Sequence, residues 1–420
     1  MRVALASYRS KPHSGGQGIY VRNLSRELVA LGHDVEVFSG PPYPELDPGV
    51  RLTRLPSLDL YRPEDPFRRP ARREFRDRVD VLEFLTMCTG GFPEPRTFGM
   101  RLARLLADRV GEYDVLHDNQ TLAPGILALA ARGLPVLTTI HHPISADRRV
   151  ELAAARGLRR LTVRRWYGFV AMQRRVARRS AHVLTVSRRA VQDIVADFGV
   201  PAERIRVVPA GVDVSAFRPP EAERVIGRVV TVASADVHAK GLDVLVGALR
   251  RVPRALFREL IVVGTASEAT SRAIADAGLT GRVRFVSGLP TGELAALLGS
   301  AQLLAVPSRY EGFSLPAVEA LACATPVAAS DVGALPELVG GDGECGVLVP
   351  PGDAGALAAA LAGLLADPAA CRTLGERGRR RAVGTYSWTA VARATAALYA
   401  EIAAGRPAAA RPRPDRPVAA

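Results

Sequence analysis

The sequence has few cysteines and no long apolar run. Its four cysteines, Cys88, Cys323, Cys345 and Cys371, show no C-x-x-C spacing. A disulfide framework and a zinc site are therefore not expected, and a reducing compartment is indicated. No apolar stretch approaches the roughly 20 residues that cross a bilayer, and the first one ends at Tyr8 without a small-residue cleavage site. These absences predict a cytoplasmic protein.

Aromatic residues and lysine are also scarce. Aromatics make up 5% of the chain and all hydrophobic residues 48%, so the cores must be built mostly from alanine, valine and leucine. Of the 56 lysine and arginine residues, only Lys11 and Lys240 are lysine. A GC-rich genome explains most of this bias, because arginine codons are GC-rich. The 420 residues exceed one ordinary core and indicate two or three domains.

The positive charge is concentrated in the segment 148–189, which contains 13 arginines and one acidic residue, Glu151. Its apolar positions include Leu158, Leu161, Trp166, Phe169, Val170 and Met172. This pattern is typical of an amphipathic basic helix and indicates an anionic membrane surface or a phosphate-bearing substrate. A solvated helix face in an arginine-rich protein explains it equally well. Nucleic acid is not expected as a partner, because no recognised binding motif accompanies the segment.

Short apolar runs alternate with helical patterns along the chain. Strands are expected near 2–8, 34–39, 115–117, 136–141 and 182–187, and again near 229–233, 260–264, 283–287, 303–307, 327–330 and 346–349. Such β/α alternation predicts parallel sheets covered by helices on both faces. We expect two doubly wound domains, 1–212 and 213–385, that face each other across a cleft. A helix over 386–404 packs back toward the first domain, and the proline-rich tail 405–420 is disordered.

Residues 55–100 interrupt this alternation with six prolines and many charges. We interpret them as an insertion in the first domain, which forms a lid or a platform for a substrate.

The sharpest motif is Arg309-Tyr-Glu-Gly-Phe-Ser-Leu-Pro-Ala-Val-Glu-Ala320, which follows a strand and opens a helix. Pro316 fits the first turn of a helix, where its missing N–H costs nothing. The backbone N–H groups around Ser314–Ala317 then form a site for an anion such as a diphosphate. The two carboxylates, Glu311 and Glu319, stand eight residues apart across the strand-to-helix turn, and Glu319 is close enough to reach the hydroxyls of a ligand.

This motif, E-G-F-x-L-P-x-x-E-A, resembles the signature of the retaining family-4 (group 1) glycosyltransferases. The similarity covers nearly the whole chain and implies the GT-B fold, with two Rossmann-like domains. It also implies that Glu319 binds the ribose of a nucleotide and that Glu311 lies near the donor sugar. Phe313, Ser314 and Leu315 belong to the same donor-binding turn.

Three further segments match the family. Gly15-Gly16 matches the N-terminal loop that approaches the donor phosphates, and Thr139-Ile140-His141 matches a segment whose histidine faces the sugar. The turn 209–213 also fits, with Ala210 where asparagine is common. The donor-binding residues implied are Gly15, Gly16, Lys240, Phe313, Ser314, Leu315 and Glu319, and the catalytic residues are His141, Lys240 and Glu311.

Lys240 precedes a glycine, where a compact ammonium group can approach a diphosphate as a point charge. In the family an R-x4-K pair neutralises the leaving diphosphate, and its lysine matches Lys240. The arginine of that pair falls on Ala235 here, so half of the clamp is missing. Arg309 or another side chain substitutes for it, with Lys11 as a further candidate, or the donor is bound differently.

Two histidine pairs follow strands of the first domain. His141 and His142 are adjacent and point to opposite sides of a strand end, and we favour His141 as the residue in the cleft. His117 and Asp118 form a weaker candidate for the acceptor side.

The chain lacks a D-x-D motif, the usual carboxylate pair for metal-held nucleotide diphosphates. No metal or other cofactor is therefore expected, and cations with helix N-termini stabilise the leaving group. The resemblance implies transfer of a sugar from a nucleotide-diphosphate donor to an acceptor hydroxyl with retention.

The acceptor is either a lipid or lipid-linked molecule at the cytoplasmic face of the membrane, or a soluble metabolite or polysaccharide. Other functions stay open from sequence: a nicotinamide-dependent dehydrogenase, a sugar-nucleotide epimerase of the same fold, and a non-catalytic binding protein.

Overall fold

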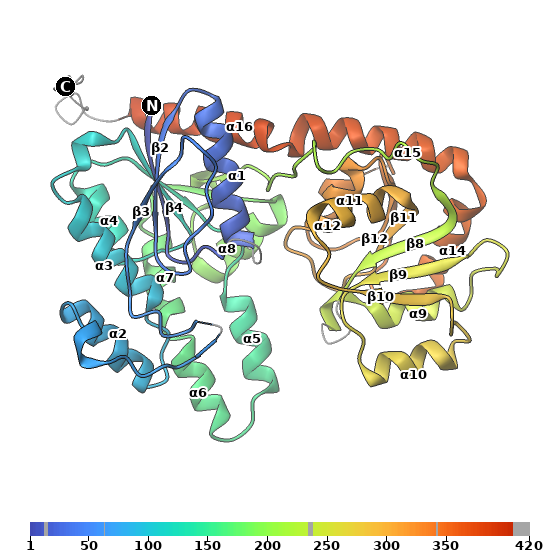
Figure 1. Cartoon of the computed structure of the whole chain (residues 1–420), viewed down its shortest axis with the longest axis horizontal. Helices are drawn as coiled ribbons and strands as arrows, with labels where there is room; N and C mark the ends of the chain where they lie inside the picture. The colour runs from blue at the N-terminus through green and yellow to red at the C-terminus, as the bar shows by residue number, and fades with distance from the viewer. Residues whose placement is uncertain (12–15, 63, 234–237, 342, 406–420) are drawn as a thin grey trace. The chain divides into compact units, whose positions relative to one another are not determined.

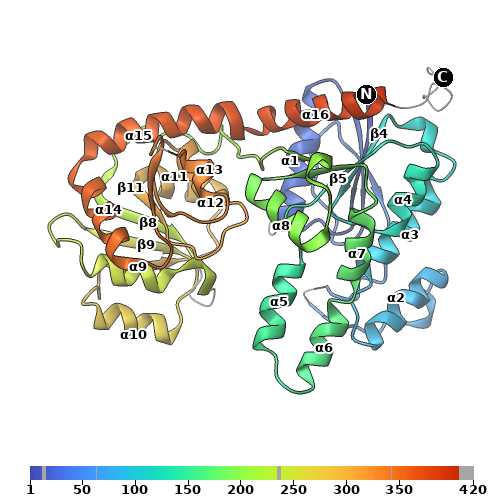
Figure 2. The same cartoon turned by 180° about the vertical axis from the view of Figure 1, so that it is seen from behind.

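The computed structural model describes residues 1–11, 16–62, 64–233, 238–341 and 343–405. They form two compact units (Figure 1, Figure 2). The first unit holds the chain up to Val186, then Ala190–Val208 and the chain from Ala392 onward. The second unit holds Ser187–Arg189 and Pro209–Val391.

The first unit is built on a seven-stranded sheet in the order β3-β2-β1-β4-β5-β6-β7, in which all neighbouring strands are parallel. Its strands are β1 (Arg2–Ser7), β2 (Asp34–Ser39), β3 (Arg51–Arg54), β4 (Val115–Asn119), β5 (Val136–Thr139), β6 (His182–Thr185) and β7 (Ile205–Val207). All five residues of β4 are buried, as expected for a central strand covered on both faces.

Helices cover both faces of this sheet. On one face, α3 and α4 pack around Leu116, and α7 and α8 pack around Val183. On the other face, Tyr20 of α1 meets the ring of His117. The helices are α1 (Gly16–Ala30), α2 (Arg78–Cys88), α3 (Glu94–Leu106), α4 (Pro124–Ala131), α5 (Ser145–Ala154), α6 (Arg159–Trp166), α7 (Phe169–Ala177) and α8 (Arg188–Phe198). Short 3-10 turns lie at Arg72–Glu74, Val110–Glu112 and Ala202–Arg204.

The second unit is built on a six-stranded parallel sheet in the order β10-β9-β8-β11-β12-β13. Its strands are β8 (Val225–Val232), β9 (Glu259–Val263), β10 (Val283–Val286), β11 (Ala301–Val306), β12 (Val327–Ser330) and β13 (Gly346–Val349). Its helices are α9 (Leu242–Leu249), α10 (Glu268–Asp276), α11 (Thr291–Ser300), α12 (Leu315–Ala322), α13 (Leu335–Val339), α14 (Ala354–Ala366) and α15 (Pro368–Arg381). A 3-10 turn at His238–Lys240, a π-helical turn at Ala382–Tyr386 and α16 (Trp388–Ala404) complete the described elements.

Strand β11 shows how this sheet is buried. Leu303 and Ala305 belong to the core that contains the buried side chains of α9 and α14. Leu304 and Val306 belong to the core that contains those of α11, α12 and α13. Successive strand residues point to opposite faces, so one short apolar run supplies both cores. This explains how a chain poor in aromatics fills two interiors with small aliphatic side chains.

In both sheets the order of the strands reverses once: successive strands are first added on one side of the starting strand and then on its other side. The reversal falls between β1 and β4 in the first unit and between β8 and β11 in the second. Loops leaving the carboxyl ends of such strands diverge to either side and leave a crevice, where open α/β sheets bind their ligands. The segments after β4 and β5, and those after β8 and β11, are therefore the places to examine.

Two doubly wound parallel-sheet domains are confirmed, but two expected features are wrong. The basic segment 148–189 is not one amphipathic helix, since it is divided among α5, α6, α7 and β6. Gly157, with a φ of +54°, lies in the break between α5 and α6. The region 55–100 is not wholly an insertion, because α3 begins at Glu94 and its Phe98 packs into the sheet core.

The chain passes between the units after Val208 and again after Val391, so α16 contributes to both. The predicted disordered tail, apart from Gly405, lies outside the described residues. Within the described parts of the chain no single helix has the length and hydropathy to cross a membrane, and α14 with α15 passes that test only as a pair bent by 100°.

Candidate active site

In the second unit, the loops after β8 and β11 bring together a lysine and two polar partners. Lys240 ends the 3-10 turn after β8, and its Nζ lies 2.8 Å from Oε2 of Glu311. Ser308 donates its hydroxyl to the same Oε2 at 3.1 Å. Glu311 is 7% exposed, whereas the Lys240 side chain is 32% exposed. We call Lys240, Ser308 and Glu311 the Lys–Glu cluster: a buried carboxylate holds a half-exposed cation at the strand switch point.

Two glycines make this cluster possible. Gly241 has a φ of +66°, and a Cβ there would meet the carbonyl oxygen of Pro307 at 2.0 Å. Gly333 has a φ of +60°, and its Cβ would meet the carbonyl oxygen of Glu311 at 1.6 Å. The backbone N–H of Ala334 donates to that same oxygen at 3.2 Å. A side chain at either glycine would displace the backbone that carries Lys240 or Glu311.

Helix α12 begins directly after this loop, as the sequence predicts. Ser314 is its N-cap residue and is buried, but its side chain makes no capping hydrogen bond, and a proline stands in the first turn. The first-turn N–H groups are therefore open to an acceptor from outside the helix, and an anionic ligand is a suitable one. Phe313 is partly buried and packs against the core beside α12. Leu315, the first residue of the helix, is partly buried.

Glu319 lies one turn into α12 and is partly buried. Burial raises the pKa of its carboxyl to about 7. A carboxylate in this position gains from any ligand that donates hydrogen bonds to it, and the hydroxyls of a ribose are such donors.

Arg309, one candidate to substitute for the missing family arginine, is paired within the second unit. Its guanidinium group binds Asp243 at 2.6 and 2.8 Å and donates to the carbonyl of His238 at 3.0 Å. Ala235, where the family arginine would fall, lies outside the described residues. Lys240 is therefore the one described cation that the structure brings to Glu311.

In the first unit, the ends of β4 and β5 carry hydrogen-bonded histidines. Nε2 of His141 lies 2.8 Å from Oδ1 of Asn119, and the backbone N–H of His141 donates to Oε1 of Gln120 at 2.8 Å. The ring of Tyr20 meets His141 edge-on at 4.8 Å. Burial lowers the pKa of His141 to about 3, so the imidazole is neutral at physiological pH. Since Asn119 presents an oxygen, Nε2 carries the proton and Nδ1 is left as an acceptor.

His117 and Asp118 are placed differently from the prediction. His117 has no exposed surface, and its two ring nitrogens lie 2.5 Å from the hydroxyls of Tyr399 and Thr139. Asp118 is also fully buried and accepts the backbone N–H groups of Thr121 and Leu122. This geometry offers no surface of either side chain to an acceptor, so neither is carried into the function proposed below. We call His117, Asn119, Thr139 and His141 the histidine cluster.

The glycine-rich loop is only partly described. Gly15 lies outside the described residues, whereas Gly16 is the first residue of α1. Lys11 is exposed. A Cβ at Gly18 would meet the carbonyl oxygen of Lys11 at 2.0 Å, so Gly18 allows the chain at Lys11 to lie directly on α1.

Several of these residues were not predicted from sequence. Asn119, Gln120, Ser308 and Gly333 belong to no motif, and the only available signal for Asn119 was its place at the end of an apolar run. Among the described residues, no three histidine, cysteine, aspartate or glutamate side chains form a group able to hold a metal ion. The predicted absence of a metal stays a prediction.

Comparisons with known proteins agree with the motif. The family described as "Glycosyl transferases group 1" matches residues 215–381, and "Glycosyltransferase Family 4" matches residues 14–216. A protein of Mycolicibacterium hassiacum named "MMP alpha-(1->4)-mannosyltransferase" is 55% identical over 402 residues, which are 95% of this chain and 98% of the relative. A D-inositol 3-phosphate glycosyltransferase of Xylanimonas cellulosilytica is 32% identical over 97% of this chain and 98% of its own length.

Solved structures show the same fold. Sucrose-phosphate synthase from Thermosynechococcus elongatus superimposes with a TM-score of 0.67 at 27% identity, over 96% of this chain and 99% of its own. The glycosyltransferase WaaG, at 19% identity, superimposes with a TM-score of 0.65 over 94% of this chain and 99% of its own. With the two parallel-sheet units, these similarities confirm the GT-B fold class.

Proposed function

Because the chain belongs to the group 1 glycosyltransferases of family 4, we propose that it transfers mannose from a nucleoside-diphosphate mannose to the 4-hydroxyl of a mannoside, in α linkage. Its glycosyltransferase activity follows from the family; the sugar and the linkage are the proposal. The name of the 55% identical relative supports both. The Lys–Glu cluster carries the mechanistic part, since it sets one half-exposed ammonium group beside the unfilled N-terminus of α12.

The difficult step is departure of the diphosphate. Breaking the bond between the anomeric carbon and the phosphate oxygen leaves negative charge on that oxygen and positive charge on the sugar. Nζ of Lys240 and the first N–H groups of α12 are preorganised to stabilise the oxygen. Glu311 keeps the ammonium group oriented when no donor is bound, and its carboxylate provides negative charge at the sugar side.

The second part of the reaction forms the new glycosidic bond. The acceptor oxygen attacks the anomeric carbon on the face from which the diphosphate leaves, which retains the configuration. The acceptor proton passes to the departing phosphate oxygen, and the products are the mannoside and a nucleoside diphosphate. No metal takes part in this scheme, in which cations and backbone N–H groups bind the diphosphate.

The histidine cluster has a role that needs no charge. His141 is held neutral by burial and is oriented by Asn119 and the amide of Gln120. Its Nδ1 accepts a hydrogen bond from a hydroxyl of the donor sugar and helps fix the sugar for attack. A protonated imidazole would instead oppose the positive charge that develops on the sugar.

The acceptor is proposed to be a mannoside, either lipid-linked at the inner membrane face or soluble. Both forms have the same 4-hydroxyl, and an assay with both distinguishes them.

The test offers GDP-mannose, UDP-glucose and ADP-glucose to the purified protein with an α-mannoside acceptor. Product formation from the mannosyl donor, with an α-(1→4) linkage in the NMR spectrum, is expected. Transfer of glucose alone would overturn the choice of sugar, and a β linkage would overturn retention. Donor turnover to an isomeric sugar nucleotide without an acceptor would indicate an epimerase instead.

A further inference from the structure

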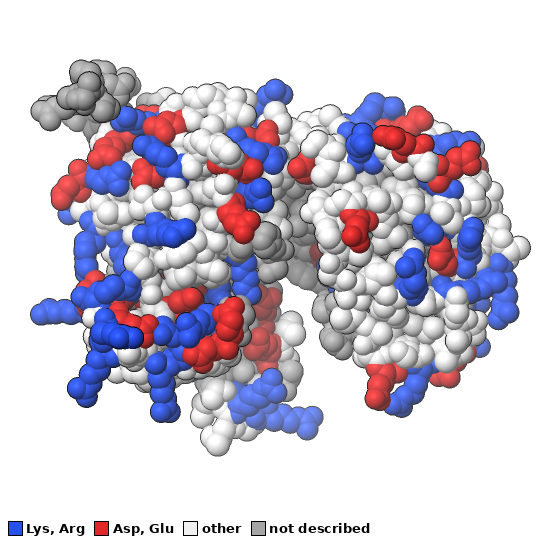
Figure 3. All heavy atoms as spheres, viewed as in Figure 1, with Lys and Arg blue, Asp and Glu red and all other residues white. Residues whose placement is uncertain are grey.

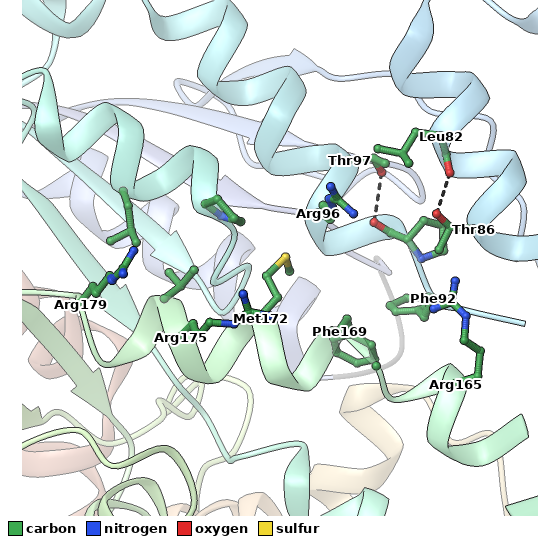
Figure 4. Close-up of a pocket in the computed structure, with 15 residues that line it drawn as sticks. Leu82, Thr86, Phe92, Arg96, Thr97, Arg165, Phe169, Met172, Arg175 and Arg179 are labelled. Atoms are coloured by element: carbon green, nitrogen blue, oxygen red, sulfur yellow. Dashed lines mark hydrogen bonds between the residues drawn. The ribbon is translucent and has the colours of Figure 1, made fainter. Parts of the chain in front are cut away.

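A cavity of about 420 Å³ lies wholly within the first unit, apart from both clusters. Its walls come from α2, α3, the start of α4, the end of α6 and α7, and Figure 4 shows Met172 pointing from α7 toward α3. The apolar lining includes Leu82, Phe92, Leu127, Phe169, Met172 and Val176. Cavities of roughly this size commonly hold small molecules.

Four arginines surround this apolar floor: Arg96, Arg165, Arg175 and Arg179. All four are exposed, and no carboxylate is among the residues that line the cavity. The side chain of Arg165 donates to the Thr89 hydroxyl and that of Arg175 to the carbonyl of Ala171. In the described part of the chain, none of the four has an aspartate or glutamate partner.

Neighbouring arginines of the same unit are paired. Arg76 and Arg101 both bind Asp80, and Arg104 binds Asp77. Figure 3 shows blue and red side chains intermixed over the region where α2 and α3 lie in Figure 1. The rim arginines have no such carboxylate partners among the described residues, and their uncompensated charge beside an apolar floor suits an anion.

Packed rings fix one wall of the cavity. Phe92 lies 5.2 Å from Trp166 and 5.3 Å from Phe169, centroid to centroid. Tyr61 packs edge-on against Trp166 at 5.3 Å and donates its hydroxyl to the carbonyl of Gly91. In a chain with so few aromatics, this concentration holds the wall in one arrangement, so the cavity is preformed.

The cavity offers little to a neutral sugar. Its two threonine hydroxyls are already used, since Thr86 donates to the carbonyl of Leu82 at 2.7 Å and Thr97 to that of Pro93 at 3.3 Å (Figure 4). A hydrocarbon chain needs no hydrogen bonds and fits such a floor.

We propose that this cavity binds an anionic amphiphile, whose hydrocarbon chain lies on the floor and whose phosphate or other anionic group is held by the rim arginines. The ligand chemistry has two sources, a lipid in a bilayer or a soluble acyl anion. This binding site is independent of the donor site and of the transfer reaction.

The probe is dodecyl phosphate, titrated below its micelle-forming concentration by calorimetry. The change in fluorescence of Trp166, which adjoins the cavity through Phe92, reports the location. Saturable binding of about one molecule per chain is expected, and inorganic phosphate or decanol alone should not match it.

Two double variants separate the site from general charge. Arg175→Glu/Arg179→Glu reverses two rim arginines and should weaken binding at least about tenfold. Arg160→Glu/Arg174→Glu makes the same charge change at exposed arginines outside the cavity and should weaken it less than about twofold. Met172→Trp fills the floor and should also weaken binding, with the melting temperature checking the fold.

Vesicles of phosphatidylglycerol identify the source. Sedimentation with vesicles that is lost in Arg175→Glu/Arg179→Glu assigns the ligand to a bilayer, and binding of the monomeric probe without sedimentation assigns it to a soluble anion. The proposal is overturned if dodecyl phosphate does not saturate, if both double variants weaken binding equally, or if inorganic phosphate or an α-mannoside displaces the probe fully.

Discussion

The Lys–Glu cluster and the histidine cluster lie at the same edge of two similar sheets, where the strands end, but differ in charge. The Lys–Glu cluster follows β8 and β11, and the histidine cluster lies at the ends of β4 and β5. The first pairs the ammonium group of Lys240 with a carboxylate, whereas burial keeps His117 and His141 neutral. In the proposed function, the same edge of the two sheets therefore serves two chemistries, one for a charged leaving group and one for the hydroxyls of a sugar.

The two clusters differ in charge because their hydrogen-bond partners differ in charge. In the histidine cluster each described ring nitrogen contact is a neutral oxygen, such as the amide of Asn119. Neutral partners do not stabilise an imidazolium, so the cost of burying a charge lowers the pKa of both histidines. In the Lys–Glu cluster, the opposite charge of Glu311 stabilises the ammonium group. Disturbing the charged cluster should therefore cost catalysis more than disturbing the neutral one.

The largest effect is expected for Lys240→Ala. Loss of the ammonium group should lower kcat by about 10²–10³-fold, which corresponds to roughly 3–4 kcal/mol of transition-state stabilisation. Steady-state kinetics would measure it, and circular dichroism should show an unchanged fold. Arg309→Ala breaks the nearby Arg309–Asp243 pair and is the matched control, with a change below about threefold. Equal losses in the two variants would contradict a specific role for Lys240.

Gly333→Ala tests whether the backbone that carries Glu311 must lie where it does. The left-handed φ and the contact with the carbonyl of Glu311 should together cost about 1–3 kcal/mol of unfolding free energy and reduce kcat. Gly363→Ala, in α14 with open space around it, should be neutral or slightly stabilising. Chemical denaturation measures both variants, and an undisturbed Gly333→Ala protein would rule out this constraint.

Glu319 should give the second unit a pH dependence opposite in sign to that of the histidine cluster. Because burial lowers the pKa of His117 and His141 from 6.5 to about 3, those residues make the folded state more stable as pH rises toward 6.5. Burial instead raises the pKa of Glu319 to about 7, while the unfolded carboxyl keeps a value near 4.5. The folded state therefore loses stability as pH rises from about 4.5 to 7, by about 2 kcal/mol after allowance for partial exposure.

Glu319→Gln should remove this pH-dependent loss. Between pH 5 and pH 8 the stability of the variant should therefore rise relative to that of the unaltered protein. The affinity of the unaltered protein for a nucleoside diphosphate should increase over the same rise in pH, because only the ionised carboxylate accepts hydrogen bonds from two ribose hydroxyls. Melting curves and calorimetry at both pH values would check this, and parallel curves for the two proteins would contradict it.

The smallest effect is expected for Asn119→Ala. It removes the acceptor that fixes the tautomer of His141, at a cost of about 1 kcal/mol and roughly a fivefold loss of kcat/KM. Gln192→Ala changes an amide on α8 that is outside the cluster and is the control. A loss as large as that of Lys240→Ala would break the proposed contrast between the clusters.

Sequence predicted the parts of this structure that depend on local pattern. Most strands are short buried runs, and the turn before α12 carries a recognisable motif. β3 was missed because Arg51–Arg54 has no buried residue, and β7 because it spans only Ile205–Val207. The single basic helix was wrong because the apolar positions hid the interruption at Gly157.

The site was harder to predict because its contacts join distant residues. Lys240 and Glu311 are 71 residues apart in sequence, and no spacing rule connects them. Only the strand order brings β8 beside β11 and thus the two side chains together. Asn119 and Gly333 acquire their roles from the same topology.

Thermal stabilisation by UDP, GDP, ADP and NAD at equal concentration, measured for the unaltered protein and for Glu319→Gln, tests the central claim most directly. One nucleoside diphosphate at 100 times its Kd should add about 2.7 kcal/mol of stability, and Glu319→Gln should lose most of that gain. Stabilisation by NAD alone, or an equal gain in both proteins, would contradict a donor site built on the Lys–Glu cluster and α12.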